Sequence, residues 1–442
     1  MARLFGTDGV RGLAGGEVLT AELAFRLSAA AAIELLGEQL EQGAHPLVVI
    51  GRDTRPSGPM LEAAAFAGFA SVGCDVARLG VVPTPAVAYE VQQGASLGLV
   101  ISASHNPAPD NGLKLFAAGG SKLTDAQEDA IEARLGGPLR QAGDRPGEDR
   151  SADARGDGPS YAEHLLATVG SLAGLTVVVD GAQGAASALA PEVYRAAGAE
   201  VHAIHCEADG WRINDGSGAT HPESLAAAVV ERGADIGIAH DGDADRCIVV
   251  DASGRVVNGD QVLGLLALGR KDAALPGADV LVATVMSNLG LHLAMREAGI
   301  SVVTTAVGDR YVLEEMLAHD HRLGGEQSGH VVMRDFATTG DGLLTAMQVM
   351  DRMARTGRRL AELADAVTLL PQVLVNVRTD RSRATDPGVL EAVATEEASL
   401  AGAGRVLLRP SGTEPLVRVM VEAESADKAQ AVADRLAAVV AG

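Results

Sequence analysis

Residues 176–204 read TVVVDGAQGAASALAPEVYRAAGAEVHAI. A short apolar strand at residues 176–179 opens the stretch, and a loop starts at Asp180. A helical segment follows and ends before Gly198, after which residues 200–204 form a second strand. Glycine just past a helix is a common C-terminal signal, and short apolar strands fit a sheet covered on both faces. The stretch therefore predicts a strand–helix–strand unit of an α/β domain.

The same layout of strand, helix, glycine and strand occurs twice more in the chain. Three copies, each in its own block of about 100–150 residues, favour three related α/β domains. The alternative is that such units are simply frequent in any α/β protein. The strands of the two further copies cover residues 47–50 with 75–79 and 279–283 with 301–305, and the glycines are Gly73 and Gly299.

The remaining segments set the domain organisation. Residues 138–159 are rich in Gly, Asp and Arg without periodicity, which predicts a linker. After residue 369 the pattern changes to a smaller α+β domain. Its strands are expected at residues 373–378, 405–408 and 416–422, and its closing helix at 425–440. The predicted domains are residues 1–152, 153–253, 254–368 and 369–442.

Composition excludes several classes of partner. The formal net charge of the 442-residue chain is −22, which argues against nucleic acid and anionic membranes because both need a basic surface. No apolar run is long enough for a membrane span or a signal peptide. The three cysteines are far apart and odd in number, so we expect free thiols and a cytoplasmic location. They are Cys74, Cys206 and Cys247.

A serine motif follows the apolar strand at residues 97–101. It reads SASHNP over residues 102–107 and contains Ser104 beside His105. Ligands sit at the carboxyl ends of parallel strands, and a serine held in a turn next to a histidine can be a nucleophile. The alternative is that the serines and Asn106 only form the turn.

An acidic motif, DGDADR, occupies residues 241–246 between two apolar strands, 235–239 and 247–250. Three carboxylates at alternate positions repel one another unless a cation neutralises them, and hard oxygen ligands suit magnesium or calcium. An EF-hand is excluded because its sixth and twelfth positions would be Arg246 and Ala252. The alternative is a solvated acidic loop.

Further motifs predict binding of phosphate and sugar groups. Residues 409–415 read RPSGTEP, with Arg418 beyond, and could cradle a phosphate with guanidinium and backbone N–H donors. The glycine-rich residues 324–330 could bind sugar hydroxyls. Both could equally be ordinary turns. Lys114, one of four lysines, is a candidate proton carrier, and Arg11 lies in an N-terminal glycine loop.

Taken in order, these motifs resemble the α-D-phosphohexomutase superfamily, and the resemblance covers the whole chain. One departure is visible, since Ala244 stands where the family's metal loop usually has glycine. This substitution is expected to strain the loop slightly while all three carboxylates remain. The shared motifs are FGTDGVRG at residues 5–12, SASHNP at 102–107, DGDADR at 241–246, GEQSGH at 325–330 and RPSGTEP at 409–415.

The resemblance implies three α/β domains with mixed sheets and a fourth that is TATA-box-binding-protein-like, around a central cleft. It implies an isomerase, an intramolecular phosphotransferase that interconverts glucosamine 6-phosphate and glucosamine 1-phosphate through a bisphosphate and so feeds UDP-N-acetylglucosamine and cell-wall precursor synthesis. One Mg²⁺ ion is implied, with glucosamine 1,6-bisphosphate or glucose 1,6-bisphosphate as activator. A homodimer and an activating kinase are further expectations. Rival readings are a phosphomannomutase or phosphoglucomutase, a magnesium-dependent phosphatase, and a non-catalytic sugar-phosphate binding protein.

The resemblance also implies residue roles. Ser104 would carry the phosphate as phosphoserine, and one of its oxygens would complete the metal site. The base is left open among Lys114, His105 and His330, with Lys114 and His330 favoured, and Lys114 could serve only if its pKa were depressed. Arg246 would support the transferred group. The metal ligands would be Asp241, Asp243 and Asp245; the sugar would be bound by Gly308, Asp309, Arg310, Glu326 and Ser328; the phosphate would be bound by Arg409, Ser411, Gly412, Thr413 and Arg418.

Overall fold

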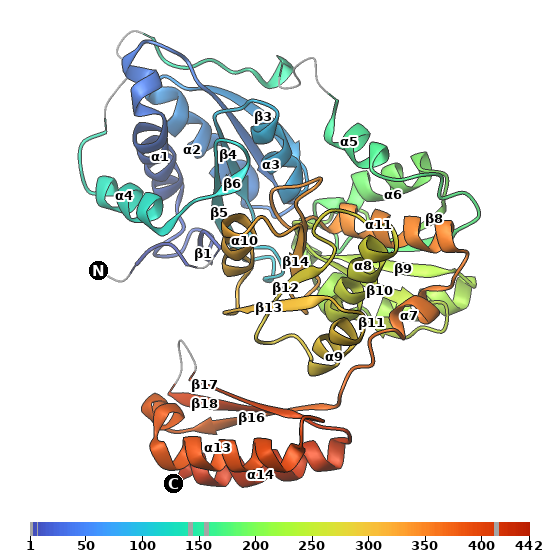
Figure 1. The fold of residues 1–442 in the computed structure, drawn as a ribbon. Helices are drawn as coiled ribbons and strands as arrows, with labels where there is room; N and C mark the ends of the chain where they lie inside the picture. Colours follow the sequence, from blue (N-terminus) through green and yellow to red (C-terminus); the bar gives the residue numbers. More distant parts are fainter. Residues whose placement is uncertain (1–2, 7, 140–144, 154–158, 411–414) are drawn as a thin grey trace.

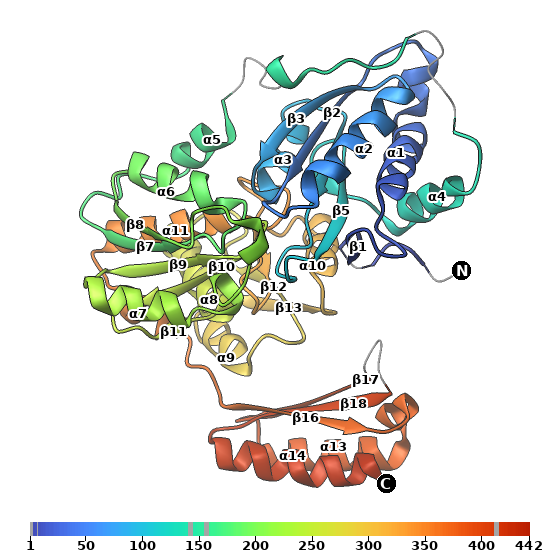
Figure 2. The same ribbon diagram turned by 180° about the vertical axis from the view of Figure 1, so that it is seen from behind.

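The computed structural model describes residues 3–6, 8–139, 145–153, 159–410 and 415–442. Within them the chain forms four separate sheets, one for each predicted domain (Figure 1). The first three domains lie close together, while domain IV stands apart and is joined by the segment that follows residue 364 (Figure 2). The predicted fold class, three α/β domains with mixed sheets plus an α+β domain, is confirmed.

Domain I is built on a six-stranded sheet with the order β1-β5-β4-β2-β3, and β6 pairs with β5. Strand β2 alternates its side chains between two cores: Val48 and Ile50 pack with helices α1 and α2, whereas Val49 packs with α3 on the other face. The strands are β1 (Val10–Leu13), β2 (Leu47–Arg52), β3 (Asp75–Val81), β4 (Leu97–Ile101), β5 (Asp110–Ala117) and β6 (Ser121–Lys122); the helices are α1 (Ala21–Glu41), α2 (Gly58–Ser71), α3 (Thr84–Gln92) and α4 (Asp125–Leu135).

Domains II and III share one hydrophobic core, which is why they pack closely. The hairpin of β10 and β11 crosses the boundary placed at residues 253 and 254. Domain II contains β7 (Thr176–Asp180), β8 (Glu200–Ile204), β9 (Ile236–His240), β10 (Cys247–Asp251), β11 (Val256–Val257), α5 (Tyr161–Ala167), α6 (Ala186–Ala196) and α7 (Glu223–Arg232). Domain III contains β12 (Val280–Thr284), β13 (Ser301–Thr305), β14 (Leu323–Gly325), β15 (Val331–Met333), α8 (Gly259–Asp272), α9 (Leu289–Glu297), α10 (Asp309–Ala318), α11 (Gly342–Thr356) and α12 (Leu360–Ala364).

The three α/β domains repeat one strand arrangement. In each, two outer strands run parallel to a central strand, and a fourth strand runs antiparallel beside one of them. The corresponding orders are β3-β2-β4-β5, β8-β7-β9-β10 and β13-β12-β14-β15. Gly73, Gly198 and Gly299 follow their helices with φ of 101°, 106° and 66°, a conformation that glycine adopts readily. The predicted threefold repeat is therefore confirmed.

The repeat brings three sequence motifs to equivalent positions. The serine motif follows β4, the acidic motif follows β9, and residues 326–330 follow β14. Each motif connects the last parallel strand of its sheet to the antiparallel neighbour. Because this connection lies at the carboxyl end of a parallel strand, each domain presents one chemical loop at its ligand-binding edge.

Domain IV is a three-stranded antiparallel sheet with the order β16-β18-β17 and two helices on one face. It contacts domain III near Asn288, whose side-chain amide donates to the carbonyl of Leu370 over 2.9 Å. Its elements are β16 (Gln372–Arg378), β17 (Arg405–Pro410), β18 (Leu416–Glu422), α13 (Pro387–Leu400) and α14 (Ala426–Ala441).

Part of the predicted linker pairs with a strand of domain I. Residues 147–150 lie along the edge strand β3, where the amide of Val76 donates to the carbonyl of Glu148 over 2.9 Å. This pairing covers the open edge of the sheet of domain I. Among the described residues, no helix is both long and apolar enough to cross a membrane.

Candidate active site

The loop after β4 holds Ser104 in an unusual backbone conformation. Its φ of 51° is left-handed, which costs an ordinary residue about 1–2 kcal/mol, and it is 1% exposed. The Ser104 hydroxyl donates a hydrogen bond to Asp241 of domain II over 2.6 Å. The serine hydroxyl of domain I is thus directed at the acidic loop of domain II.

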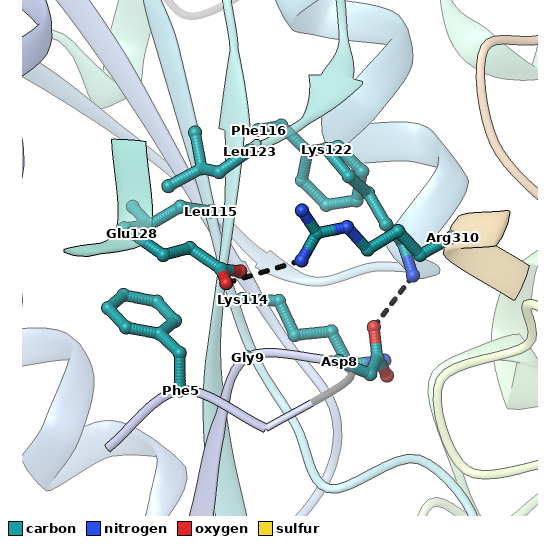
Figure 3. Close-up of a pocket in the computed structure, with 10 residues that line it drawn as sticks. All are labelled: Phe5, Asp8, Gly9, Lys114, Leu115, Phe116, Lys122, Leu123, Glu128 and Arg310. Carbon is teal, nitrogen blue, oxygen red and sulfur yellow. Dashed lines mark hydrogen bonds and ion pairs between the residues drawn. The ribbon is translucent and has the colours of Figure 1, made fainter. Parts of the chain in front are cut away.

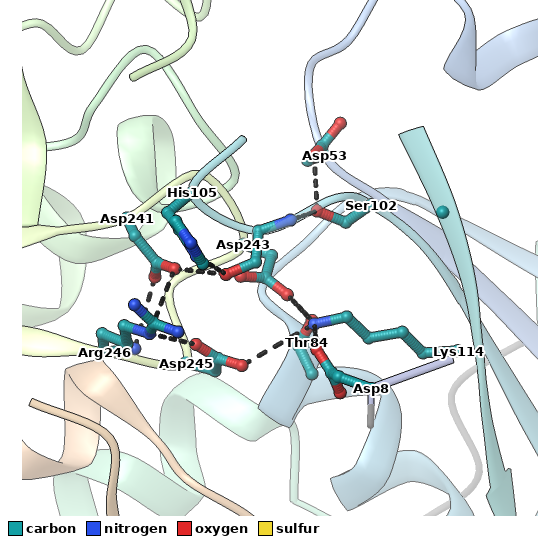
Figure 4. A network of polar contacts seen from close by, with 12 residues as sticks. Asp8, Asp53, Thr84, Ser102, His105, Lys114, Asp241, Asp243, Asp245 and Arg246 are labelled. Atoms are coloured by element: carbon teal, nitrogen blue, oxygen red, sulfur yellow. Dashed lines mark hydrogen bonds and ion pairs between the residues drawn. The ribbon is translucent and has the colours of Figure 1, made fainter. Parts of the chain in front are cut away.

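Ser102 has a different environment although it belongs to the same motif. Its hydroxyl donates to Asp53 over 2.5 Å (Figure 4). The same hydroxyl accepts the backbone N–H of Ser104 over 2.9 Å. Both contacts stay within domain I and support the turn. The geometry therefore separates the two serines and favours Ser104 as the group that faces a substrate.

The acidic loop between β9 and β10 can hold a cation. One carboxylate oxygen from each of Asp241, Asp243 and Asp245 lies within 4.8 Å of the other two, and all three residues are buried. Among the described residues, Asp243 Oδ1 and Asp245 Oδ1 have no hydrogen-bond partner. Leaving buried acceptors unpaired is costly, whereas a hard divalent cation takes oxygen ligands of this kind. The buried triad is therefore able to bind a metal ion.

The pKa values of two carboxylates in the triad are shifted in opposite directions. Burial, together with the nearby Asp245 and Asp243, raises the pKa of Asp241 to about 7. Burial also works against ionisation of Asp245, but Lys114 and His330 lower its pKa below the ordinary value. Like charges at short range produce this separation, and a bound cation would relieve it.

Ala244 lies at the centre of the acidic turn with a φ of 59°. The left-handed region is unfavourable for alanine, so the strain expected from the missing glycine is present. The carbonyl of Ala244 accepts the N–H of Gly342 over 3.0 Å, at the start of α11. The loop thus keeps its shape, and its three carboxylates stay together despite the alanine.

Lys114 on β5 is surrounded by carboxylates. Its Nζ lies 2.7 Å from Asp243, 2.8 Å from Asp8 and 3.7 Å from Asp245. Burial alone would lower the pKa of Lys114, but these carboxylates, Asp243 first, raise it above the ordinary value. A lysine base needs the opposite shift. Here the ammonium of Lys114 balances the charge of the acidic loop, and its role as a base stays a prediction.

His105 is adjacent to the carrier candidate, with Nδ1 3.4 Å from Ser104 Oγ. Burial lowers the pKa of His105 to about 4, and the nearby Arg246 and Arg11 add to this effect. The imidazole is therefore neutral near pH 7.

His330 follows β14 and is enclosed by two carboxylates. Its ring nitrogens lie 3.6 Å from Asp245 and 3.4 Å from Asp309. Burial opposes the charged form, but Asp245 and Asp309 raise the pKa of His330 to about 8. His330 is therefore mostly cationic near neutral pH, in contrast to His105.

Two arginines extend the positive charge around the triad. Arg246 Nε lies 3.9 Å from both Asp241 and Asp245, and Arg11 pairs with Asp8. Within the described part of the chain, the Nε atoms of Arg246 and Arg11 are buried without a hydrogen-bond partner. Guanidinium donors without partners near the acidic triad suit an anionic ligand.

The residues predicted to bind the sugar come from two segments, around residues 308 and 326, that contact each other. Glu326 Oε1 accepts the N–H of Gly308 over 3.1 Å, so residues 308 and 326 share one loop cluster. The hydroxyl of Ser328 is buried without a partner among the described residues, which leaves it able to bind a sugar hydroxyl. These sugar-binding roles stay predictions.

Asp309 and Arg310 instead contact domain I. Asp309 pairs with Lys122, and Arg310 lies 2.7 Å from Asp125 and 3.5 Å from Glu128. Arg310 and Lys122 line the small pocket of Figure 3. In this structure the two side chains therefore join domain III to domain I.

Only part of the predicted phosphate-binding motif of domain IV lies among the described residues. Arg409 on β17 lies opposite Arg418 on β18, at the end of the sheet that precedes the turn. Arg409 is half-buried and Arg418 is exposed. Ser411, Gly412 and Thr413 lie outside the described residues.

Several site residues escaped the sequence argument. Thr84 donates its hydroxyl to Asp243 over 2.7 Å, and Lys122 lies 2.7 Å from Asp8. Lys122 is one of four lysines, and Asp8 belongs to the N-terminal glycine motif, so scarcity and motif membership could have pointed to them. Thr84 carries no such signal, because it reaches the site only through packing of domain I on domain II.

Comparison with known proteins decides the family. Models of the four phosphoglucomutase/phosphomannomutase domains match the chain: α/β/α domain I at residues 2–138, domain II at 159–254, domain III at 258–369 and the C-terminal domain at 374–439. The chain belongs to the phosphoglucomutase/phosphomannomutase family. Its resemblance to the α-D-phosphohexomutases is thereby confirmed.

Relatives within this family match the full chain. A phosphoglucosamine mutase of Frankia alni is 61% identical, covering 100% of this chain and 98% of its own length. One from Rhodococcus jostii is 58% identical, covering 100% of both chains. A solved structure of a family protein from Burkholderia thailandensis has a TM-score of 0.81 at 25% identity, covering 99% of this chain and 97% of its own.

Next to the acidic loop of this family member lies a further buried carboxylate, that of Asp341. It begins helix α11 and accepts hydrogen bonds from the N–H of Leu344 and the hydroxyl of Tyr161, both over 2.9 Å. Burial raises the pKa of Asp341 to about 6. The ionised form is therefore disfavoured by folding.

We expect Asp341→Asn to stabilise the protein at alkaline pH. A raised folded-state pKa means that the contribution of Asp341 is fully present below about pH 4 and is lost as pH rises through about 6. Asparagine keeps a side-chain acceptor without the charge. Urea titration should give a free energy of unfolding about 1–3 kcal/mol higher than wild type at pH 8, and no gain at pH 4. An equal change at both pH values would contradict this reading.

Proposed function

We propose that this protein is a phosphoglucosamine mutase that interconverts glucosamine 6-phosphate and glucosamine 1-phosphate through phospho-Ser104. The proposal is carried by one observation: the Ser104 hydroxyl, fixed in a left-handed turn, lies 2.6 Å from a buried acidic triad able to bind a metal. Full-length relatives at 57–61% identity that are named phosphoglucosamine mutase support the choice of sugar.

The phosphoryl group moves in two transfers. The free hydroxyl of the bound sugar monophosphate attacks phosphorus on phospho-Ser104, a new P–O bond to the sugar forms, and the P–O bond to Ser104 breaks. The sugar proton leaves to a base and the Ser104 oxygen takes up a proton. The bisphosphate then reverses in the site, and its other phosphate returns to Ser104, so atoms and charge balance over the cycle. Positioning and charge stabilisation dominate such transfers.

Asp241, Asp243 and Asp245 would hold Mg²⁺, with an oxygen of phospho-Ser104 completing the site. When bound, the ion neutralises the charge that develops on the transferred group. Hard oxygen ligands and unpaired buried carboxylate oxygens fit this ion.

The charge states of the basic residues divide the remaining work. Lys114 and His330 are cations, which suits them to balancing phosphate charge. His105 is neutral and 3.4 Å from Ser104 Oγ, so it is placed to accept the Ser104 proton when the bisphosphate returns its phosphate. The residue that takes the sugar proton stays a prediction, with Lys114 and His330 favoured.

The other predicted roles belong to the same proposal. Glu326 and Ser328 would bind sugar hydroxyls, while Arg409 and Arg418 would bind the phosphate that is not transferred. Glucose 1,6-bisphosphate or glucosamine 1,6-bisphosphate would load Ser104 initially, and a kinase is the alternative route. Ser104 and the triad come from one chain, so a homodimer is not required. Three free thiols support a cytoplasmic location.

A comparison of three substrates tests the function. With a bisphosphate activator present, kcat/KM for glucosamine 1-phosphate should exceed that for glucose 1-phosphate and mannose 1-phosphate by about tenfold or more. A preference for either of the other hexoses would change the assigned substrate. Release of free phosphate in step with substrate loss would replace the mutase with a phosphatase.

Substitution of Arg409 tests the phosphate grip. We expect Arg409→Gln to raise KM about 10–100-fold with a smaller effect on kcat, because a charge-assisted hydrogen bond to phosphate is lost outside the reacting centre. Arg435→Gln is the matched control, since Arg435 pairs with Glu396 on the helical face of the same domain. An unchanged KM for Arg409→Gln would remove this arginine from the site.

A further inference from the structure

Arg55, in the loop after β2, has a fully buried side chain that the proposed chemistry does not use. Its guanidinium lies beneath the serine loop and donates only to backbone carbonyls there, apart from its carboxylate partner. Nη2 donates to the carbonyl of Ser104 over 2.9 Å and to that of Asn106 over 2.7 Å. Nη1 donates to the carbonyl of Asp110 over 2.9 Å and to that of Pro107.

The charge of Arg55 is matched within the same network. Arg55 Nε donates to Asp53 Oδ2 over 2.8 Å, and the Arg55 backbone N–H donates to Asp53 Oδ1 over 2.9 Å. Asp53 Oδ2 also accepts the Ser102 hydroxyl, which in turn accepts the N–H of Ser104. The Arg55–Asp53 pair therefore holds both the N–H and the carbonyl of Ser104.

Asn214 of domain II also donates hydrogen bonds to this part of the serine loop. The Asn214 side-chain amide donates to the carbonyl of Ser104 over 2.9 Å and to that of Asn106 over 3.1 Å. These are the two carbonyls that Arg55 Nη2 also contacts. At Gly242, in the acidic loop, a Cβ atom would lie 2.5 Å from the carbonyl of Ser104, so the two loops pack directly.

Ser104 needs such a clamp because its backbone is strained. A residue with a φ of 51° keeps that conformation only where its surroundings over-determine it. Without donors on its carbonyl, the turn could relax to an ordinary conformation and carry the hydroxyl away from Asp241. A shift of about 1 Å at a reacting group can cost about 100-fold in rate.

We propose that Arg55, aided by Asn214, is the positioning residue that holds Ser104 in the geometry required for phosphoryl transfer. This inference rests on the proposed role of Ser104 as the phosphoryl carrier. Arg55 acts through the carbonyls of the loop and touches neither the transferred group nor the cation site. A lysine could keep the charge but not serve four carbonyls at once, because only the planar guanidinium presents its donors as a fixed fork.

The test measures Arg55→Lys, Arg55→Ala and Asn214→Gly. The glycine variant removes the amide while tolerating the left-handed φ of 61° at residue 214. We expect kcat to fall about 100-fold in both Arg55 variants and about tenfold in Asn214→Gly, with KM nearly unchanged. Added guanidinium ion should partly restore Arg55→Ala, whereas ammonium should not.

Arg26→Lys is the matched control. Arg26 also lies in domain I and donates to two backbone carbonyls, but these belong to Leu135 and Gly137 at the end of α4, both over 2.9 Å, and not to the serine loop. It should lose some thermal stability and keep kcat. A loss of kcat in Arg26→Lys equal to that in Arg55→Lys would show a general effect of weakening the domain, and would overturn the proposal.

The rate at which glucose 1,6-bisphosphate phosphorylates Ser104, followed by intact mass, separates this inference from the proposed function. Slow loading in the Arg55 and Asn214 variants beside fast loading in wild type supports the clamp. Wild-type loading rates and kcat in Arg55→Lys and Asn214→Gly would overturn it, even if Arg55→Ala does not fold. If wild type itself never gains phosphate at Ser104, the carrier role falls first, and the inference falls with it.

Discussion

Ser104→Ala should abolish mutase turnover. Removing a nucleophile that carries the transferred group eliminates the covalent route, and we expect kcat to fall by at least about 10⁴-fold in the presence of glucose 1,6-bisphosphate. The change is small in volume, so the fold should persist. A coupled assay measures turnover, and intact mass should show phosphate on the wild-type protein and none on the variant.

Ser71→Ala is the control for this experiment. Ser71 lies at the end of α2 in the same domain, and its hydroxyl donates only to the carbonyl of Gly68 over 2.8 Å. It should keep both turnover and phosphorylation. Turnover of Ser104→Ala near the wild-type level would show that another group carries the phosphate.

Asp243→Asn should weaken both metal binding and turnover. The substitution removes a buried carboxylate whose Oδ1 is unpaired and whose Oδ2 accepts from Lys114 and Thr84. We expect Mg²⁺ affinity, measured by calorimetry, to fall by about 10–100-fold or more, and kcat at saturating Mg²⁺ to fall by about 10²–10³-fold. The loss at limiting Mg²⁺ should be larger still.

Asp251→Asn tests whether any buried carboxylate of domain II would have the same effect. Asp251 lies at the far end of β10 and pairs with Arg255 at 2.9 Å, away from the acidic loop. The variant should bind Mg²⁺ as wild type does. Undiminished Mg²⁺ binding and activity in Asp243→Asn would remove the triad from the metal site.

Much of the fold could be predicted because hydrophobic patterning decides it locally. Residues 97–101, 200–204, 301–305 and 416–422 are strands with the predicted bounds. The sharing of one core by domains II and III could not be predicted, since it depends on side chains that meet only after folding. The pairing of residues 147–150 with β3 could not be predicted either, because a segment without periodicity gives no strand signal.

Some features of the candidate site could likewise be predicted from the sequence, and others could not. Motifs located Ser104 and the acidic triad because their chemistry is contained within a few adjacent residues. Protonation states could not be predicted, since the pKa of Lys114 is set by Asp8 and Asp243 from different parts of the chain. Arg55 was missed because a buried arginine that binds carbonyls looks, in sequence, like any surface arginine.

The equivalent placement of one chemical loop in each of three repeated sheets has an evolutionary consequence. The loops meet pairwise, Ser104 with Asp241 and Asp245 with His330, yet each is a short connector on its own scaffold. One connector can therefore lengthen or change composition while the other two keep their registers. If the proposed roles hold, sugar preference would change through Glu326 and Ser328 in the connector after β14, while Ser104 and the acidic triad stay in place.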